Sequence, residues 1–333
     1  MNTQTIIEKC QNIPGVSIST DTHSLQLHLN TPDGTGTMTF CPLFPGITLA
    51  YISVHASCWP APDIAGEADS GKGPLIINYC IGGRCELMLN NDSYVYITEH
   101  QLSLTERFAQ EQYIYPGRHY HGMEFFIDLD MTCEKSPFLS EYFCLNLKQL
   151  STSFCPSGNT YIAPASRQTD RLFQSLWQYE AATKPDTDFQ RRNLSLQIFH
   201  ALLNKPQDIS PKPCTFYTKS QAAIAKETEA ILTGNLQAHP SAKELAARFS
   251  VSETSLKNYF RGIYGQNLSD YMREYRMKRA AELLSSTHDS VNRISEQVGY
   301  LNQSKFAAVF KKQFGLSPLE YRRIYTNKVT ISD

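Results

Sequence analysis

The sequence predicts an α+β protein, with an N-terminal antiparallel β domain followed by an all-α domain that contains two helix-turn-helix units. Three observations support this fold class. Short apolar runs with strand-like alternation lie between residues 47 and 127, apolar residues take up helical spacing from Ser166 onward, and a repeat with a period of 50 residues occupies the C-terminal third. The length of 333 residues accommodates two or three domains of ordinary size.

The N-terminal part, residues 1–165, is expected to form a barrel or sandwich of short antiparallel strands. Its apolar segments, such as residues 47–55 and 74–81, are separated by turn-forming pairs at Gly82-Gly83, Asn90-Asn91 and Pro116-Gly117. Short strands with regular turn signals are typical of all-β layers.

Residues 166–205 are expected to form a pair of helices. Apolar residues recur at helical spacing in two groups, which Lys184-Pro185-Asp186 separates. The first group is Leu172, Phe173, Leu176 and Trp177, and the second is Leu194, Ile198 and Leu202. A stripe of this kind belongs to a core more often than to an interface. Three prolines between Lys205 and Pro213 cannot continue a helix, so residues 206–222 are expected to form a stiff linker.

The segment 223–326 matches itself at an offset of 50 residues. The matching pairs are Leu256 with Phe306, Phe260 with Phe310, Tyr264 with Phe314, Gly265 with Gly315, and Tyr271 with Tyr321. Each copy begins with a short helical segment, residues 243–249 or 292–298, followed by a tight turn and a second helix that starts near Ser252 or Asn302. This pattern predicts two helix-turn-helix units.

Local signals fix the ends of these helices. Ser241 with Glu244, and Ser317 with Glu320, fit the capping box. Gly299 can adopt the left-handed conformation in the second turn, whereas Ser250 takes the equivalent place in the first. Residues 268–284 read as one amphipathic helix of about 25 Å that connects the two units.

Charge is divided unevenly along the chain. The formal net charge is -1, but residues 221–333 hold 16 Lys/Arg against 11 Asp/Glu, which leaves 15 against 21 for residues 1–220. An anionic partner is therefore expected at the C-terminal domain. All 9 cysteines lie between Cys10 and Cys214, without zinc-finger spacing, and no leader-like or membrane-spanning segment is present. These features favour a cytoplasmic protein with no membrane association.

The C-terminal residues resemble the AraC/XylS family of bacterial transcription regulators. The resemblance rests on Ile294, Val298-Gly299-Tyr300, Asn302-Gln303-Ser304, Phe306, Phe310-Lys311, Phe314-Gly315, Ser317-Pro318 and Tyr321-Arg322, with Tyr275-Arg276, Ala280 and Leu283-Leu284 in the connecting helix. It covers about 100 residues. It implies two helix-turn-helix units on double-stranded promoter DNA, contact with RNA polymerase, and a transcription regulator that is not an enzyme and needs no cofactor.

The family's base-reading positions fall on Thr254, Lys257 and Asn258 in the first unit, and on Asn302, Gln303 and Ser304 in the second. Asn and Gln can form two hydrogen bonds with adenine, and Lys can bond to guanine. Ala308 stands where the family often has a long polar residue, so the second unit is expected to read fewer bases. The implied phosphate ligands are Arg261, Lys305, Lys311, Lys312, Arg322 and Arg323. The alternative is that these cations form only a solvated face of a helical bundle.

The N-terminal half resembles the family's sensor domains less specifically. Residues 79–86 and 94–102 are similar to the Gly-rich hairpin and next strand of a cupin-like barrel, although His100-Gln101 replaces the usual Gly-Asp. The resemblance implies that a small-molecule effector binds in the barrel and that residues 166–205 form a homodimer. His55, Trp59 and Tyr79 are candidates for lining the effector pocket, with aromatic core filling as the alternative.

Three other readings of the N-terminal half remain open. A partner protein, and not a small molecule, would control the chain if the barrel were filled. A metal-dependent cupin enzyme would need a His-x-His pair, and His119 and His121 are the only such pair. No third His follows at the expected spacing, so no metal site is predicted. Cys80 and Cys85 flank Gly82-Gly83 and could face each other across a hairpin as a redox pair, although free buried cysteines are common.

Overall fold

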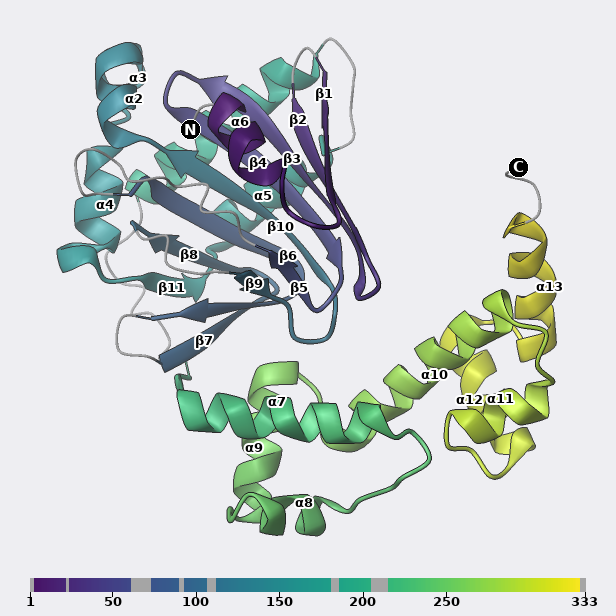
Figure 1. Ribbon diagram of the computed structural model, residues 1–333. Helices are drawn as coiled ribbons and strands as arrows, with labels where there is room; N and C mark the ends of the chain where they lie inside the picture. The colour runs from purple at the N-terminus through teal and green to yellow at the C-terminus, as the bar shows by residue number, and fades with distance from the viewer. Residues whose placement is uncertain are drawn as a thin grey trace. The chain divides into compact units, whose positions relative to one another are not determined.

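The computed structural model describes residues 3–21, 24–60, 73–89, 93–106, 112–180, 186–204 and 215–329. The chain separates into two compact units, Met1–Phe216 and Tyr217–Asp333, which are coloured purple to teal and green to yellow in Figure 1.

The first unit is built on antiparallel strands. They are β1 (Val16–Thr20), β2 (Leu25–Thr31), β3 (Gly34–Phe44), β4 (Ile47–His55), β5 (Cys58–Pro60), β6 (Leu75–Met88), β7 (Ser93–Thr98), β8 (Gln101–Thr105), β9 (Gln112–Ile114), β10 (Tyr120–Ile127) and β11 (Tyr161–Pro164). The main sheet has the order β1-β2-β3-β4-β10-β6, β6 also pairs with β7 and β8, and β8 pairs with β11. Strands β5 and β9 form a separate pair. The predicted antiparallel β-rich unit is confirmed, but the pairings among the described residues do not close into a barrel.

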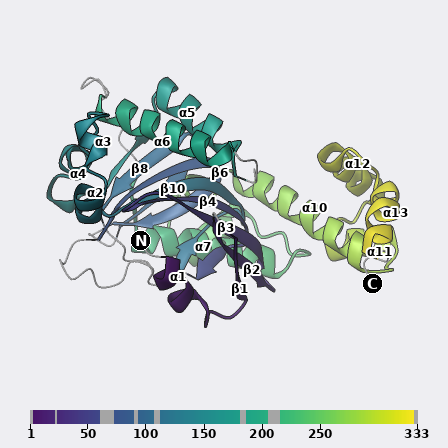
Figure 2. The same ribbon diagram turned by 90° about the horizontal axis from the view of Figure 1, so that it is seen from above.

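Helices accompany both faces of this sheet. They are α1 (Thr3–Cys10), α2 (Leu129–Lys135), α3 (Phe138–Glu141), α4 (Lys148–Phe154), α5 (Arg167–Trp177) and α6 (Thr187–Leu203), with one 3-10 turn at Pro156–Gly158. Strand β10 shows how the faces are divided, because alternate side chains point to opposite sides of a strand. Met123 and Phe125 lie in a helix-side core with α5 and α6, whereas Tyr120 and Phe126 lie in a second core with α1. Figure 2 shows α5 and α6 over one face of the sheet and α1 near the other.

Gly82-Gly83 does not separate two strands, which corrects the sequence prediction. Strand β6 runs through both glycines, and its register against β10 shifts between His121 and Gly122. Gly83 has a φ of 85°, and a Cβ on it would lie 2.2 Å from the carbonyl oxygen of His119, so the strand needs glycine for close approach and not for a turn. The left-handed turn before β8 is taken by His100, with a φ of 63°.

The predicted helical pair is present as α5 and α6, and its apolar stripe packs against its own sheet. Leu176, Ile198 and Leu202 are buried in the helix-side core, and Trp177 and Leu194 pack against it. The proline-rich residues 205–214 lie outside the described residues. Helix α7 already begins at Lys219, within the segment expected to be a linker.

The second unit contains a two-residue strand followed by helices. They are β12 (Tyr217–Thr218), α7 (Lys219–Gly234), α8 (Ala242–Arg248), α9 (Glu253–Tyr264), α10 (Leu268–Ser286), α11 (Val291–Gln297), α12 (Gln303–Phe314) and α13 (Pro318–Val329). The predicted helical domain with two helix-turn-helix units, α8–α9 and α11–α12, is confirmed. Helix α10 is shared, because Tyr271 and Met272 join the core of the first unit and Met277 and Leu284 join that of the second. Helix α7 packs on the first core. The predicted domain began at residue 223, so the sequence prediction left the start of α7 in the linker.

The 50-residue repeat is visible as repeated ring packing. The ring of Phe260 meets that of Tyr271 edge to face at 5.3 Å and 83°, and the ring of Phe310 meets that of Tyr321 at 5.4 Å and 86°. Gly265 and Gly315 end α9 and α12 in the left-handed conformation. Equivalent residues therefore hold the two units in equivalent geometry.

Candidate nucleic-acid interface

The two second helices, α9 and α12, are held by buried side chains on one face. Leu256 and Phe260 of α9, like Phe306 and Phe310 of α12, are fully buried. A helix fixed along one face leaves its opposite face available for a ligand. This arrangement puts the sequence-predicted base-reading residues on two comparable exposed surfaces.

The turns before these helices are set by capping and by positive φ. Ser250 has a φ of 55° and Gly299 a φ of 84°, in equivalent turns, as the sequence predicts. The hydroxyl of Ser252 accepts a hydrogen bond from the amide of Ser255 at the start of α9. Both predicted capping boxes form, and the hydrogen bonds from Ser241 and Ser317 lower the pKa values of Glu244 and Glu320. These carboxylates therefore stay ionised at the helix starts.

A close contact fixes the second turn against the loop after α7. The guanidinium of Arg276 on α10 donates to the carbonyl oxygen of Leu236 at 2.9 Å, and also to that of Ala238 at 3.3 Å. A Cβ on Gly299 would lie 2.1 Å from the same Leu236 oxygen. Gly299 is thus required twice, by its φ and by this approach.

The exposed face of α9 carries Thr254, Lys257 and Asn258 together. They lie at relative positions i, i+3 and i+4, which share one helical face, and all three are exposed. The ammonium of Lys257 pairs with the carboxylate of Glu253, with Nζ 2.5 Å from Oε1. To bind a guanine, the ammonium of Lys257 must either break its ion pair with Glu253 or contact the base and the carboxylate at the same time.

The exposed start of α12 carries Asn302, Gln303 and Ser304, but Asn302 has a structural role. Its side-chain oxygen caps α12 by accepting from the amide of Lys305 at 2.9 Å. This oxygen keeps a second lone pair, but the cap holds the side chain toward the backbone of α12 and so competes with the predicted two-bond contact with adenine. Gln303 and Ser304 have no such commitment among the described contacts. Sequence reasoning missed Leu301, a residue that is 98% exposed immediately before the cap.

The middle of the exposed face of α12 carries short, apolar side chains. At the 50-residue offset, Lys257 and Asn258 correspond to Ala307 and Ala308, and Ala308 is exposed. An exposed alanine can contact only an apolar group, such as the methyl group of thymine.

Five of the six predicted phosphate ligands are exposed around these helices: Arg261, Lys305, Lys311, Lys312 and Arg323. Arg322 differs, because its guanidinium donates to the carbonyl oxygens of Leu284 at 3.4 Å and Asp289 at 2.5 Å. Leu284 lies in the last turn of α10 and Asp289 in the loop that follows, so Arg322 ties α13 to the end of α10. The family motif does not reveal this role.

The three candidate effector residues of the N-terminal unit do not meet around one space. Trp59 is buried in the core with α1, Tyr79 lies in the helix-side core and stacks on Phe173 at 4.3 Å, and His55 is exposed. Tyr79 and Trp59 therefore lie on opposite faces of the sheet, which sequence alternation alone did not reveal. The hydroxyl of Tyr79 donates to Asp170 of α5, and burial, together with this hydrogen bond, raises the pKa of Tyr79.

The remaining candidate chemistry does not assemble. Cys80 and Cys85 lie on the same strand and not across a hairpin, and burial raises the pKa of both thiols. His121 contacts Ser53 and His55, and across the described part of the chain no three His, Cys, Asp or Glu residues group as a metal site. None of the helices in the described ranges is both long and apolar enough to cross a bilayer.

Comparisons with known proteins agree on the C-terminal unit. A family model described as a helix-turn-helix domain matches residues 245–324. The HTH-type transcriptional regulator YisR of Bacillus subtilis (strain 168) is 23% identical over 282 residues, which covers 80% of this chain and 94% of that protein. The HTH-type transcriptional activator AarP of Providencia stuartii is 32% identical over 106 residues, or 32% of this chain and 78% of that protein. A solved transcriptional regulator with an AraC-type DNA-binding domain, from Chromobacterium violaceum, is 26% identical, covers 30% of this chain and 90% of its own, and has a TM-score of 0.29.

Proposed function

The chain belongs to the AraC/XylS family of bacterial transcription regulators, and from this premise we propose that α9 and α12 read promoter DNA in its major groove. It is a DNA-binding transcription regulator of the AraC type. The finer proposal concerns which side chains read bases. Thr254, Lys257 and Asn258 do so from α9, and Gln303 and Ser304 from α12.

One observation carries this proposal. The two helices are mounted on equivalent buried aromatic frames and present exposed polar residues on their outer faces, with Thr254 and Ser304 at equivalent positions. Exposed cations lie beside these residues, as needed to hold the phosphates that flank the contacted bases. Asn302 is assigned to capping and Arg322 to the α10–α13 contact, so neither is proposed as a primary DNA ligand.

The test compares two substitutions on α12 in the full chain, on a site selected from random DNA. Gln303→Ala should cost about 1 to 3 kcal/mol on the best site and relax preference at one base pair, with little change in salt dependence. Lys311→Ala should weaken specific and random DNA alike and reduce the salt slope by about one. Gln313→Ala, an exposed glutamine on the same helix, is the control and should leave affinity unchanged.

Binding titrations at several salt concentrations, with the selected site and its single-base variants, distinguish the two roles. A uniform loss of affinity for every sequence in Gln303→Ala would contradict base reading. A changed base preference in Lys311→Ala would show that the assignment of positions along α12 is wrong.

We further propose that the N-terminal unit binds a small-molecule effector and that the chain is a homodimer that contacts RNA polymerase. The dimer surface would lie on the outer faces of α5 and α6, because their apolar stripes are occupied by the sheet. Phe189 of α6 is 61% exposed and offers an apolar contact there. Sedimentation should show residues 1–205 as a dimer and residues 215–333 as a monomer, and the reverse result would refute this placement.

Control by a partner protein is the second candidate, and a specific observation favours it. Exposed aromatic residues occur after α3, where the side chain of Tyr142 is 79% exposed and that of Phe143 is 50% exposed. Because the two residues are adjacent in the chain, they can contribute to one apolar patch, and contiguous patches of this kind mark protein contact sites. Substitution of both by Ser would then abolish regulation without changing DNA affinity, whereas effector control predicts no change in either.

A further inference from the structure

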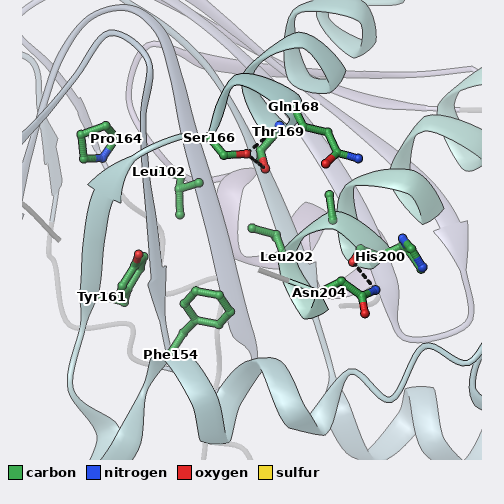
Figure 3. Close-up of a pocket in the computed structure, with 11 residues that line it drawn as sticks. Leu102, Phe154, Tyr161, Pro164, Ser166, Gln168, Thr169, His200, Leu202 and Asn204 are labelled. Atoms are coloured by element: carbon green, nitrogen blue, oxygen red, sulfur yellow. Dashed lines mark hydrogen bonds between the residues drawn. The ribbon is translucent and has the colours of Figure 1, made fainter. Parts of the chain in front are cut away.

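The N-terminal unit contains a cavity away from the residues that the sequence suggested for an effector. It has a volume of about 130 Å³ and lies between strands β8 and β11 and helices α4, α5 and α6 (Figure 3). By contrast, the space between Phe40, Tyr115 and Glu124 on the α1 side of the sheet measures about 10 Å³, which is close to one water molecule.

The floor of the larger cavity is apolar and aromatic. Leu102, Phe154 and Leu202 are buried, and the ring of Tyr161 meets that of Phe154 edge to face at 4.9 Å and 75°. Figure 3 shows these side chains around a common space. An apolar protein cavity of about 150 Å³ is known to accept benzene, so the volume suits one aromatic ring.

The rim is polar but carries no formal charge of fixed sign. Gln168, His200 and Asn204 lie at the exposed edge, and the amide nitrogen of Asn204 donates to the carbonyl oxygen of His200 at 2.9 Å. The amide oxygen of Asn204 and the amide of Gln168 can bond to a ligand. No lining residue is Asp, Glu, Lys or Arg, so a cationic ligand would lose hydration without gaining an ion pair, and an anionic ligand could pair only with the protonated form of His200.

The position of the cavity connects it to regulation. Ala201 and Leu202 belong to the last turn of α6, and Asn204 is its C-cap residue. These residues come immediately before the segment that leads to the DNA-binding unit. A ligand in the cavity therefore contacts the end of the sensor unit from which the chain continues to α7.

We propose that this cavity is the site of a neutral, single-ring aromatic effector with one hydrogen-bonding group, and that its occupation changes DNA affinity. The inference rests on the proposed function, which assigns effector control to the N-terminal unit. The ring lies on Phe154, Tyr161 and Leu202, and the polar group meets Asn204 or Gln168.

Three single-ring probes of similar size test the ligand class in the full chain. Benzamide is neutral, benzoate is an anion and benzylamine is a cation, while their rings are the same. Titration by ligand-observed NMR should show benzamide binding at least tenfold more tightly than either charged probe. Nuclear Overhauser contacts should connect benzamide to the rings of Phe154 and Tyr161. Equal binding of the three probes, or contacts elsewhere in the unit, would overturn the assignment.

A substitution that fills the cavity tests the site and its coupling. Ala201→Phe places a ring in the space and should weaken benzamide at least tenfold, and Gln197→Phe, one turn earlier on the exposed side of α6, should not. If Ala201→Phe does not fold, as judged by circular dichroism, Ala201→Leu serves with a smaller expected loss of about threefold. Saturating benzamide should change the dissociation constant for DNA in the parent chain and the control but not in the cavity variant.

The possible failures are distinguishable. Benzamide that binds but never changes DNA affinity would refute this cavity as an effector site, as would undiminished binding in Ala201→Phe. Either result would leave DNA recognition by α9 and α12 untouched. Loss of DNA binding by Gln303→Ala on all sequences alike would instead refute the proposed reading of bases, irrespective of the cavity.

Discussion

Glu253 restrains the residue on α9 that is best suited to bind guanine, so replacing it should tighten DNA binding while destabilising the domain. The carboxylate pairs with Lys257 four residues later, at 2.5 Å. It also lies in the first turn of α9, where a negative charge is favourable. Glu253→Gln removes the charge but keeps the length and polarity of the side chain, and glutamine is the residue at the equivalent position 303.

The two effects can be estimated separately. The side chains of Lys257 and Glu253 are 55% and 45% exposed, so solvent screening limits their pair to about 0.3 to 0.5 kcal/mol. Release of Lys257 should therefore improve the dissociation constant for DNA by about twofold, and more at low salt, because one repulsive charge near the phosphates is also removed. Loss of the pair and of the favourable charge at the helix start should lower the free energy of unfolding by about 0.5 to 1.5 kcal/mol.

Fluorescence titration with the selected site, at two salt concentrations, measures the first effect, and urea unfolding measures the second. Glu282→Gln is the matched control, since it breaks an exposed pair with Arg279 at 2.7 Å near the end of α10, a helix that carries none of the proposed base-reading residues. The control should not tighten DNA binding. If Glu253→Gln binds DNA no better than the parent chain, or if both variants improve equally, Lys257 is not restrained in the way that we infer.

Two further substitutions test assignments made from hydrogen bonds. Asn302→Ala should lower the free energy of unfolding by about 1 kcal/mol, as should Ser252→Ala at the equivalent cap. Asn302→Ala should leave base preference unchanged in site-variant titrations, and a changed preference would show that Asn302 reads a base. Burial raises the pKa of Glu124 from 4.5 to about 7. Because the folded state then holds the proton more tightly than the unfolded chain, the N-terminal unit should lose stability as pH rises from about 4.5 to 7, by about 3 kcal/mol in total. Glu124→Gln, which keeps the hydrogen bond from Asn78, should flatten this dependence in urea melts between pH 5 and 8, and an unchanged slope would contradict it.

The C-terminal unit could be predicted closely because its determinants are local. Capping boxes, C-cap glycines and the left-handed turn residues act within a few positions of the chain, and their signals are readable one segment at a time. Ser250 illustrates this, since the repeat placed it opposite Gly299 and both have positive φ. The 50-residue repeat also located the aromatic core, because Leu256 and Phe260 are buried in the first unit and their partners Phe306 and Phe310 are buried in the second.

The N-terminal unit could be predicted only as a class of fold. Alternation within β10 correctly separates His121 from Glu124, but it does not say which face of the sheet receives helices. Gly82-Gly83 shows a further ambiguity, because a glycine pair is equally typical of a turn and of a close approach between strands. The distinction depends on His119, which is distant in sequence and reaches Gly83 only through the β6–β10 pairing. The cavity beside α6 has the same cause, since strands and helices from four separate segments line it.

The contacts of individual side chains also indicate that the two helix-turn-helix units contribute differently to DNA binding. A motif assigns roles by position, yet Asn302 is committed to its helix and the residues equivalent to Lys257 and Asn258 are Ala307 and Ala308. The first unit therefore offers more polar groups for bases. The second has three exposed lysines on α12, Lys305, Lys311 and Lys312, whereas α9 has Arg261 besides the base-reading Lys257. Since base contacts specify and phosphate contacts position, we expect α9 to supply most of the sequence preference and α12 most of the salt-dependent affinity.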